Sequence, residues 1–189
     1  MKLYACFFRE KDLESQHEAA HRLLRFCLMK EYGIEEYSLG KGRHGKPYLE
    51  NHPDVKINLS HCKGLVVCGT GNVPLGADCE GIREVRSGVV RRVCTETEKN
   101  EIENSSDPAL VFTRMWTLKE SFVKAVGRGI SYPMRNVSFS FDKNNILTNV
   151  TGAFFCQYVL DGKYVISLCG AGNEQDVSLE IVSEKALRQ

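Results

Sequence analysis

The sequence predicts an α+β fold built as two similar lobes, each with an antiparallel sheet packed on one long helix. Three observations carry this prediction. Two long helical periodicities lie far apart in the chain, strand patterns follow one another directly, and glycine-containing turns join neighbouring strands. A doubly wound parallel sheet would instead need strands and helices in regular alternation. The faint similarity of layout between the halves permits an internal duplication, with expected lobes at residues 1–72 and 73–189.

Length and composition are those of a chain that folds around a core. Of the 189 residues, 42% are hydrophobic and 26% are charged, which excludes disordered, collagen-like and coiled-coil proteins. The 25 Lys and Arg residues nearly balance the 24 Asp and Glu residues, and the formal net charge is +1. Bulk electrostatics therefore gives no reason to expect binding to nucleic acid or to an anionic membrane.

Location and redox state follow from two further features. No apolar stretch reaches the roughly 18 residues that a membrane span needs, and the amino end does not resemble a signal peptide. The eight cysteines are scattered without CxxC pairs, and several lie in apolar runs. We expect reduced, buried thiols in a cytoplasmic protein.

The first half begins with a strand at residues 2–8. Ser15 and Glu18 form a capping-box pattern, and helical periodicity then continues to Gly33, a C-terminal stop signal. Glycine and proline interrupt residues 38–54, which predicts a long loop. The expected strands after it are residues 56–60, 65–70 and 73–79, the last two joined as a hairpin through Gly71 and Asn72.

The second half contains the longest helix. Residues 82–104 are charged and helical in pattern, with a capping box at Thr95 and Glu98. Asp107 and Pro108 are typical N-cap and N1 residues and open a periodic run that ends at Gly127 or Gly129. Asp161-Gly162 is a hairpin turn signal. The strands expected here are residues 136–142, 150–160, 163–169 and 177–182.

Two faces of the longest helix differ in chemistry. The stripe expected to be buried consists of Val111, Met115, Leu118, Phe122 and Val126. The neighbouring face carries Trp116, Lys119, Glu120 and Lys124. Taken alone, this second face is better explained as a solvated charged face with one ion pair than as a functional site.

An acidic pair closes the strand that precedes the charged stretch. Asp78 and Glu80 point to the same side of a strand, about 7 Å apart along it. Carboxylates with phosphate and water oxygens suit Mg²⁺ rather than zinc, which prefers cysteine and histidine. A solvated acidic turn is the alternative interpretation.

Two basic segments could gather phosphate. Ser60, His61 and Lys63 lie close together at the end of a strand and could bind phosphate. Because neighbouring residues of a strand point to opposite faces, Ser60 and His61 are poorly placed to act as a nucleophile and its base. Cys62 is expected to be a packed thiol. The glycine-broken loop at residues 41–47 offers cations and backbone amides, but it lacks Walker spacing, and the chain has no complete dinucleotide fingerprint.

Taken together, these segments resemble one enzyme family over roughly residues 20–141. The matching stretches are Ala20-His21-Arg22, Gly45-Lys46-Pro47, Asn58 to His61, Gly76 to Glu80, Trp116 to Lys124 and Gly127 to Ile130. In order and spacing they are similar to the 4'-phosphopantetheinyl transferases, specifically the two-lobed surfactin-type group. The WxxKExxxK element with an upstream DxE is specific in combination.

The resemblance implies a ligand cleft between the lobes and a Mg²⁺-dependent transfer of phosphopantetheine from coenzyme A. The acceptor would be a serine of an acyl or peptidyl carrier protein, and adenosine 3',5'-bisphosphate would leave. By similarity, Asp78, Glu80 and Glu120 hold the metal, and Lys124 and His61 neutralise phosphate charge. The residues expected at the nucleotide end are Arg22, Arg43, Lys46 and Ser60, while Glu120 doubles as the base.

Other functions remain open at this point. A coenzyme A binding or regulatory module without transfer, and a Mg²⁺-dependent phosphohydrolase, would use the same residues. Four arginines, Arg83, Arg86, Arg91 and Arg92, offer either a docking face for an acidic carrier protein or a solvated helix surface. A monomer is expected, because one cleft forms within one chain.

Overall fold

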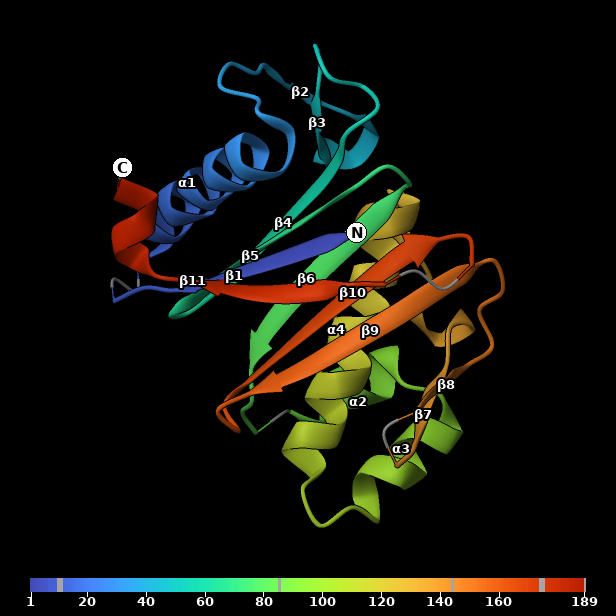
Figure 1. Cartoon of the computed structure of the whole chain (residues 1–189). Coiled ribbons are helices and arrows are strands. Elements are labelled where there is room, and N and C mark those ends of the chain that lie inside the picture. Colours follow the sequence, from blue (N-terminus) through green and yellow to red (C-terminus); the bar gives the residue numbers. More distant parts are fainter. Residues whose placement is uncertain (10–11, 85, 144, 174–175, 189) are drawn as a thin grey trace.

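Two β-sheets lie face to face between two long helices (Figure 1). The computed structural model describes residues 1–9, 12–84, 86–143, 145–173 and 176–188, without the side chains of residues 43, 130 and 188. Helix α1 (Leu13–Tyr32) covers the outer face of the first sheet, and α4 (Pro108–Val126) covers the second sheet. The fold is therefore α+β, as predicted.

The first sheet has the strand order β11-β1-β5-β4. Its strands are β1 (Lys2–Phe7), β4 (Lys56–Cys62), β5 (Leu65–Gly71) and β11 (Ser178–Val182). β1 runs parallel to β11 and antiparallel to β5, which also pairs with β4. Alternation along β1 sends Tyr4 and Cys6 toward α1, and Leu3 and Ala5 toward the second sheet.

The second sheet has the order β6-β10-β9, and all its pairs are antiparallel. Its strands are β6 (Leu75–Gly81), β9 (Ala153–Leu160) and β10 (Tyr164–Ala171). Ala77, Ile166 and Leu168 pack against the inner face of the first sheet. The turn between β9 and β10 is the predicted one, with positive φ at Asp161 and Gly162.

The remaining elements are short. Between α1 and β4 lie β2 (Leu39–Lys41), the 3₁₀ turn η1 (Arg43–Gly45) and β3 (Pro47–Leu49), so the predicted loop contains a small two-stranded sheet. The other elements are α2 (Ser87–Val93), α3 (Glu96–Glu103), η2 (Gly129–Ser131), η3 (Met134–Asn136), β7 (Phe139–Asp142), β8 (Asn145–Thr148) and η4 (Glu184–Arg188). The sequence did not indicate β8, and residue 85, within the predicted helical stretch 82–104, lies outside the described residues.

The predicted hairpin between β5 and β6 is wrong. Both edges of β5 are already paired, with β1 on one side and β4 on the other, so β6 has no free edge to join. β6 instead begins the second sheet. The sheet therefore changes at the predicted seam after residue 72, and β11 later returns to the first sheet.

The N-cap of α1 is also different from the prediction. Asp12, rather than Ser15, caps the helix, because its carboxylate accepts from both the amide and the hydroxyl of Ser15. Glu18 pairs with Arg22 instead of reaching back to the cap. At the other end, Gly33 adopts the left-handed conformation expected of a C-terminal stop (φ 64°).

The capping signals of the second half are confirmed. Thr95 and Glu98 form a reciprocal capping box on α3, and Asp107 caps α4 with Pro108 in its first turn. All eight cysteines are free thiols. Among the described residues, no helix is both long and apolar enough to cross a bilayer.

Candidate active site

Side chains of β4 connect the two sheets where β4 faces β6. Asn58 Oδ1 accepts from the Ala77 amide at 2.7 Å, and Ser60 Oγ accepts from the Cys79 amide at 3.4 Å. The two donors are also two residues apart, so successive inward side chains of β4 meet successive amides of β6. This pairing places Ser60 directly beside Asp78.

A compact polar cluster forms at this junction. The Lys124 ammonium donates to Asp78 Oδ1 at 2.6 Å, to Ser60 Oγ at 2.9 Å and to the Ala77 carbonyl at 3.1 Å. The Ser60 hydroxyl donates to the same Asp78 oxygen at 3.0 Å. Burial opposes the charged form of Lys124, but the adjacent Asp78 carboxylate outweighs this, and the net effect raises the pKa of Lys124. The lysine therefore stays cationic.

The second oxygen of Asp78 is available for a ligand. Asp78 Oδ2 is buried, and no hydrogen-bond partner among the described residues reaches it. Asp78 is only 5% exposed, so leaving this oxygen unpaired is costly unless something binds it. A buried, unpaired carboxylate oxygen is what a hard cation requires.

The pKa values of Glu80 and Glu120 are both raised at this site. Burial, followed by the charge of Asp78, raises the pKa of Glu80, and Arg83 partly offsets the shift. Burial and Asp78 also raise the pKa of Glu120 to about 7, with Lys124 acting in the opposite direction. The nearby Glu80 carboxylate also raises the pKa of Glu120, by a smaller amount. The three carboxylates therefore share one electrostatic environment, although they come from a strand and a helix.

The donor set fits Mg²⁺ in chemical type. All the donors are carboxylate oxygens, and one of them has no hydrogen-bond partner among the described residues. Magnesium prefers such oxygen ligands, whereas zinc prefers cysteine and histidine. Within the described ranges, however, no three His, Cys, Asp or Glu side chains are gathered closely enough to hold a metal ion. The acids thus interact electrostatically without forming a closed cage.

His61 points away from Ser60, as strand alternation predicts. Its Nδ1 lies 3.1 Å from Gln16 Oε1 on α1, and its ring centroid is 4.7 Å from that of His17. Because an amide oxygen only accepts, this contact places the proton on Nδ1. Burial, followed by the electrostatic effects of the neighbouring His17 and Lys124 side chains, lowers the pKa of His61, so its neutral form is favoured.

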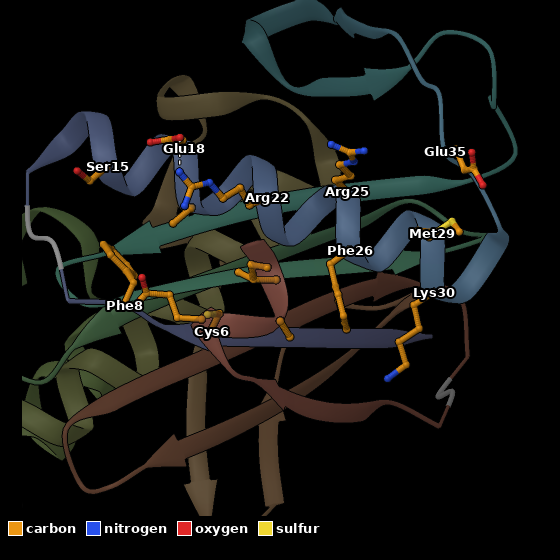
Figure 2. A pocket seen from close by; sticks show the side chains of 14 residues that line it. Cys6, Phe8, Ser15, Glu18, Arg22, Arg25, Phe26, Met29, Lys30 and Glu35 are labelled. Atoms are coloured by element: carbon orange, nitrogen blue, oxygen red, sulfur yellow. Dashed lines mark hydrogen bonds and ion pairs between the residues drawn. The ribbon is translucent and has the colours of Figure 1, made fainter. Parts of the chain in front are cut away.

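The residues expected at the nucleotide end are dispersed. Arg22 projects from α1 beside Glu18 and lines a cavity of about 920 Å³ that α1 shares with β1 and η4 (Figure 2). Lys46 lines a second cavity of about 420 Å³ near β3. The side chain of Arg43 lies outside the described residues. Neither cavity is lined by Asp78 or by the two glutamates.

Lys46 directs its ammonium into the protein. Nζ lies 2.8 Å from the carbonyl oxygen of Leu75, 2.7 Å from that of Lys124 and 3.4 Å from that of Ala125. Burial lowers the pKa of Lys46 to about 8, so it remains largely protonated at neutral pH. These partners could not be predicted from the sequence.

Lys119 on α4 is buried, contrary to the prediction. The sequence placed it on the polar face, yet it is 1% exposed, and its ammonium lies 2.8 Å from Glu98 Oε2. It also donates to the carbonyls of Val93, Met134 and Val137. Elements α3, η3 and β7 cover this side of α4, whereas Val126, predicted to be buried, is 45% exposed.

Glu98 joins these elements around Lys119. Besides pairing with Lys119, it accepts from the amides of Thr95 and Phe139. This buried network holds the turn of α4 that precedes Glu120. The capping-box pattern at Glu98 is the one sequence signal that identified part of it.

Several known proteins are similar to this chain in sequence. The family model described as the 4'-phosphopantetheinyl transferase superfamily matches residues 74–169. A 4'-phosphopantetheinyl transferase of Bacillus subtilis is 29% identical over 179 residues, which cover 86% of this chain and 80% of that protein. The 4'-phosphopantetheinyl transferase Sfp of Bacillus subtilis (strain 168) is 26% identical, covering 95% of this chain and 87% of the relative.

Among solved structures, the holo-[acyl-carrier-protein] synthase of Thermotoga maritima aligns with a TM-score of 0.46 at 19% identity. The alignment covers 54% of this chain and 64% of that chain.

The family match covers just over half of the sequence and contains both elements that carry the acids. It includes β6 with Asp78 and Glu80, and α4 with Glu120 and Lys124. The chain therefore belongs to the 4'-phosphopantetheinyl transferase superfamily.

Proposed function

We propose that this enzyme transfers the 4'-phosphopantetheine arm of coenzyme A to a serine of an acyl or peptidyl carrier protein. The reaction is Mg²⁺-dependent and releases adenosine 3',5'-bisphosphate. The observation that carries the proposal is the cluster of Lys124, Ser60 and Asp78, with its unpaired Oδ2, inside the family-matched segment. Such a cluster offers a cation to a diphosphate, and its free carboxylate oxygen could bind a metal ion that the diphosphate also binds.

Three carboxylates are proposed to hold the metal: Asp78 and Glu80 from β6, and Glu120 from α4. When bound, Mg²⁺ supplies positive charge to the pyrophosphate of coenzyme A. Support comes from Asp78 Oδ2 and from the raised pKa values of Glu80 and Glu120. Neighbouring anions that raise one another's pKa are stabilised when a cation joins them.

Glu120 is also proposed to accept the proton of the carrier serine. The serine oxygen forms a bond to the β-phosphorus, and the bond from that phosphorus to the bridging oxygen breaks. The α-phosphate then leaves as part of adenosine 3',5'-bisphosphate, and the serine proton passes to Glu120. In the metal-free protein, burial and Asp78 raise the pKa of Glu120 to about 7, above that of an ordinary glutamate.

Phosphate charge is neutralised by the lysine at the junction. Lys124 keeps its proton because of Asp78, and His61 lies within electrostatic range of both. Ser60, Arg22 and Arg43 are proposed for the nucleotide end. In this role Arg22 would exchange its Glu18 partner for phosphate.

The two-lobe arrangement is proposed with the boundary after residue 72 and the ligand cleft along the seam between β4 and β6. The change of sheet between β5 and β6 supports this boundary. The exposed arginines Arg83, Arg86, Arg91 and Arg92 are proposed to dock an acidic carrier protein. A cytoplasmic monomer is proposed, and the eight free thiols support this location.

The direct test is transfer to a carrier protein. Incubating the enzyme with MgCl₂, coenzyme A and an apo carrier should add about 340 Da to the carrier, the mass of the arm. Asp78→Asn should lower the turnover number by at least about 100-fold. Glu103→Gln, at an exposed position on α3, is the matched control and should retain activity.

Each alternative function has its own outcome in this assay. Release of inorganic phosphate without carrier modification would indicate a phosphohydrolase. Coenzyme A binding by calorimetry with no mass gain on several acyl and peptidyl carriers would indicate a binding module. Circular dichroism of Asp78→Asn separates lost chemistry from lost folding, since the substitution also removes the partner of Lys124.

A further inference from the structure

We infer that Lys46 is a positioning residue that fixes β6 against the end of α4, rather than a ligand of the nucleotide. Its consequence for catalysis rests on the proposed function, because β6 and α4 carry the acids assigned to the metal. Lys46 itself comes from the first half of the chain, between η1 and β3. It therefore links three segments that are distant in sequence.

The donors of Lys46 are fully used inside the protein. An ammonium has three N–H donors, and three carbonyls lie within reach, those of Leu75, Lys124 and Ala125. A phosphate ligand would have to displace one of them. The same side chain that was expected to bind phosphate thus has no donor left for it.

Two of these carbonyls belong to the last turn of α4. The final four carbonyls of a helix have no intrahelical partner and carry the negative end of its dipole. A lysine ammonium at this end satisfies the carbonyls of Lys124 and Ala125 and complements the dipole. The third carbonyl, of Leu75, is at the first residue of β6, so one cation joins the end of the helix to the start of the strand.

Packing at the same place shows how closely the two elements approach. A Cβ built on Gly76 would lie 2.1 Å from the Ser121 carbonyl oxygen and 2.4 Å from the Ala125 amide nitrogen. The backbones of β6 and α4 are therefore in direct contact next to Leu75. Asp78 follows two residues after Gly76, and its 2.6 Å ion pair with Lys124 spans the same interface. A shift at the Lys46 contact would move this pair.

Hydrogen bonds within the loop hold the Lys46 backbone in place. The Gly42 amide donates to the Lys46 carbonyl at 2.9 Å, and the Gly45 amide donates to the Gly42 carbonyl at 3.0 Å. His44, at the tip, has φ of 64°, an uncommon value for a residue with a side chain. Its Cβ lies 3.3 Å from the position that a Cβ on Gly129 would take, which places the tip against the segment after α4.

Kinetics of Lys46→Met test the inference, with Lys2→Met at an exposed position of β1 as the matched control. Methionine keeps the apolar stem and removes the donors. We expect the turnover number to fall by about 10- to 100-fold, the effect of a small misplacement of reacting groups, and the KM for coenzyme A to change by less than about 2-fold. The control should match the wild type in both parameters.

Hydrogen exchange gives a readout that does not need activity. In Lys46→Met, amides of residues 75–78 and 121–127 should exchange faster, while those of α1 and α3 should be unchanged. If the wild type fails to modify any carrier, the proposed function fails, and this measurement still decides whether Lys46 fixes the junction.

Three results would overturn the inference. A KM for coenzyme A raised about 10-fold or more with unchanged turnover would make Lys46 a nucleotide ligand. A lowered melting temperature with wild-type turnover and wild-type exchange at the junction would make it a stabilising residue only. Should Lys46→Met not fold, Lys46→Arg retains charge and donors in a different geometry; a KM for coenzyme A raised about 10-fold in that variant, with wild-type turnover and wild-type exchange at the junction, would equally contradict a positioning role.

Discussion

The two carboxylate oxygens of Asp78 have different surroundings. Oδ1 accepts from Ser60 and Lys124, while Oδ2 has no protein partner among the described residues. Burial, followed by the nearby Asp78 carboxylate, raises the pKa of both Glu80 and Glu120, that of Glu120 to about 7. One cluster therefore contains an ion-paired carboxylate beside a glutamate whose pKa lies near neutrality.

The raised pKa of Glu120 makes the metal-free protein pH-sensitive. The folded chain retains a proton up to about pH 7, whereas the unfolded chain loses it near 4.5. Because the folded state binds more protons in this window, the free energy of unfolding should fall as pH rises from about 4.5 to 7. Glu120→Gln removes this contribution. It should exceed the wild type in stability at pH 8 by on the order of 2 kcal/mol.

Urea unfolding in EDTA across this pH range measures the effect. The two proteins should converge near pH 4, where Glu120 is protonated in both states. Glu103→Gln, a carboxylate on the surface of α3, provides the comparison for a generic charge change. Parallel pH profiles for wild type and Glu120→Gln would show that the carboxylate ionises normally in the fold.

At the scale of elements, the contact between β6 and α4 decides the site. Asp78 and Glu80 lie on the strand, and Glu120 and Lys124 on the helix, so their relation depends on how these elements pack. Gly76 permits the approach, because only a residue without a Cβ fits against the α4 backbone. Lys46 satisfies the carbonyls at the same junction.

Gly76→Ala should be strongly destabilising. The added methyl meets backbone atoms, which cannot move without displacing α4, so we expect a loss of at least about 3 kcal/mol in the free energy of unfolding. Gly88→Ala in α2 is the matched control, since a Cβ there meets nothing within 4 Å. Stability in the control should stay constant or rise by up to about 1 kcal/mol. Chemical denaturation of both variants gives the comparison, and equal stabilities would refute the close approach.

At the scale of the whole molecule, the two sheets share one apolar cluster. Leu3 and Ala5 of the first sheet share an apolar cluster with Ala77 and Ile166 of the second. The chain also returns to the first sheet through β11, which pairs with β1. Neither half is therefore a closed unit, even though the sheet changes at the predicted seam after residue 72.

Calorimetry should accordingly show a single unfolding transition. Truncation after residue 177 removes β11 and η4, exposes the edge of β1, and should lower the melting temperature of that one transition by about 10 °C or more. Truncation after residue 183 keeps β11 and serves as the control, with a smaller decrease. Two separate transitions, only one of them sensitive to the longer truncation, would indicate independently stable lobes.

The sequence determined the features that depend on residues a few positions apart. The capping box at Thr95 and Glu98, the start of α4 at Asp107 and the turn at Asp161 and Gly162 all agree with the structure. Each is a local backbone or side-chain preference, so neighbouring residues suffice to set it. The motif residues of β6 and α4 were assigned from the resemblance to one enzyme family, and that resemblance also depends on fixed spacings within single elements.

Only the tertiary structure decided which elements became neighbours. The hairpin expected between β5 and β6 failed because β1 and β4 already occupy both edges of β5. Lys119 became buried because α3, η3 and β7 cover the face of α4 that carries it, and Lys46 found its partners on segments 29 and 78 residues away. The residues next to a side chain in the sequence do not determine which surface will cover it, because burial and long-range hydrogen bonds form only when the whole chain packs.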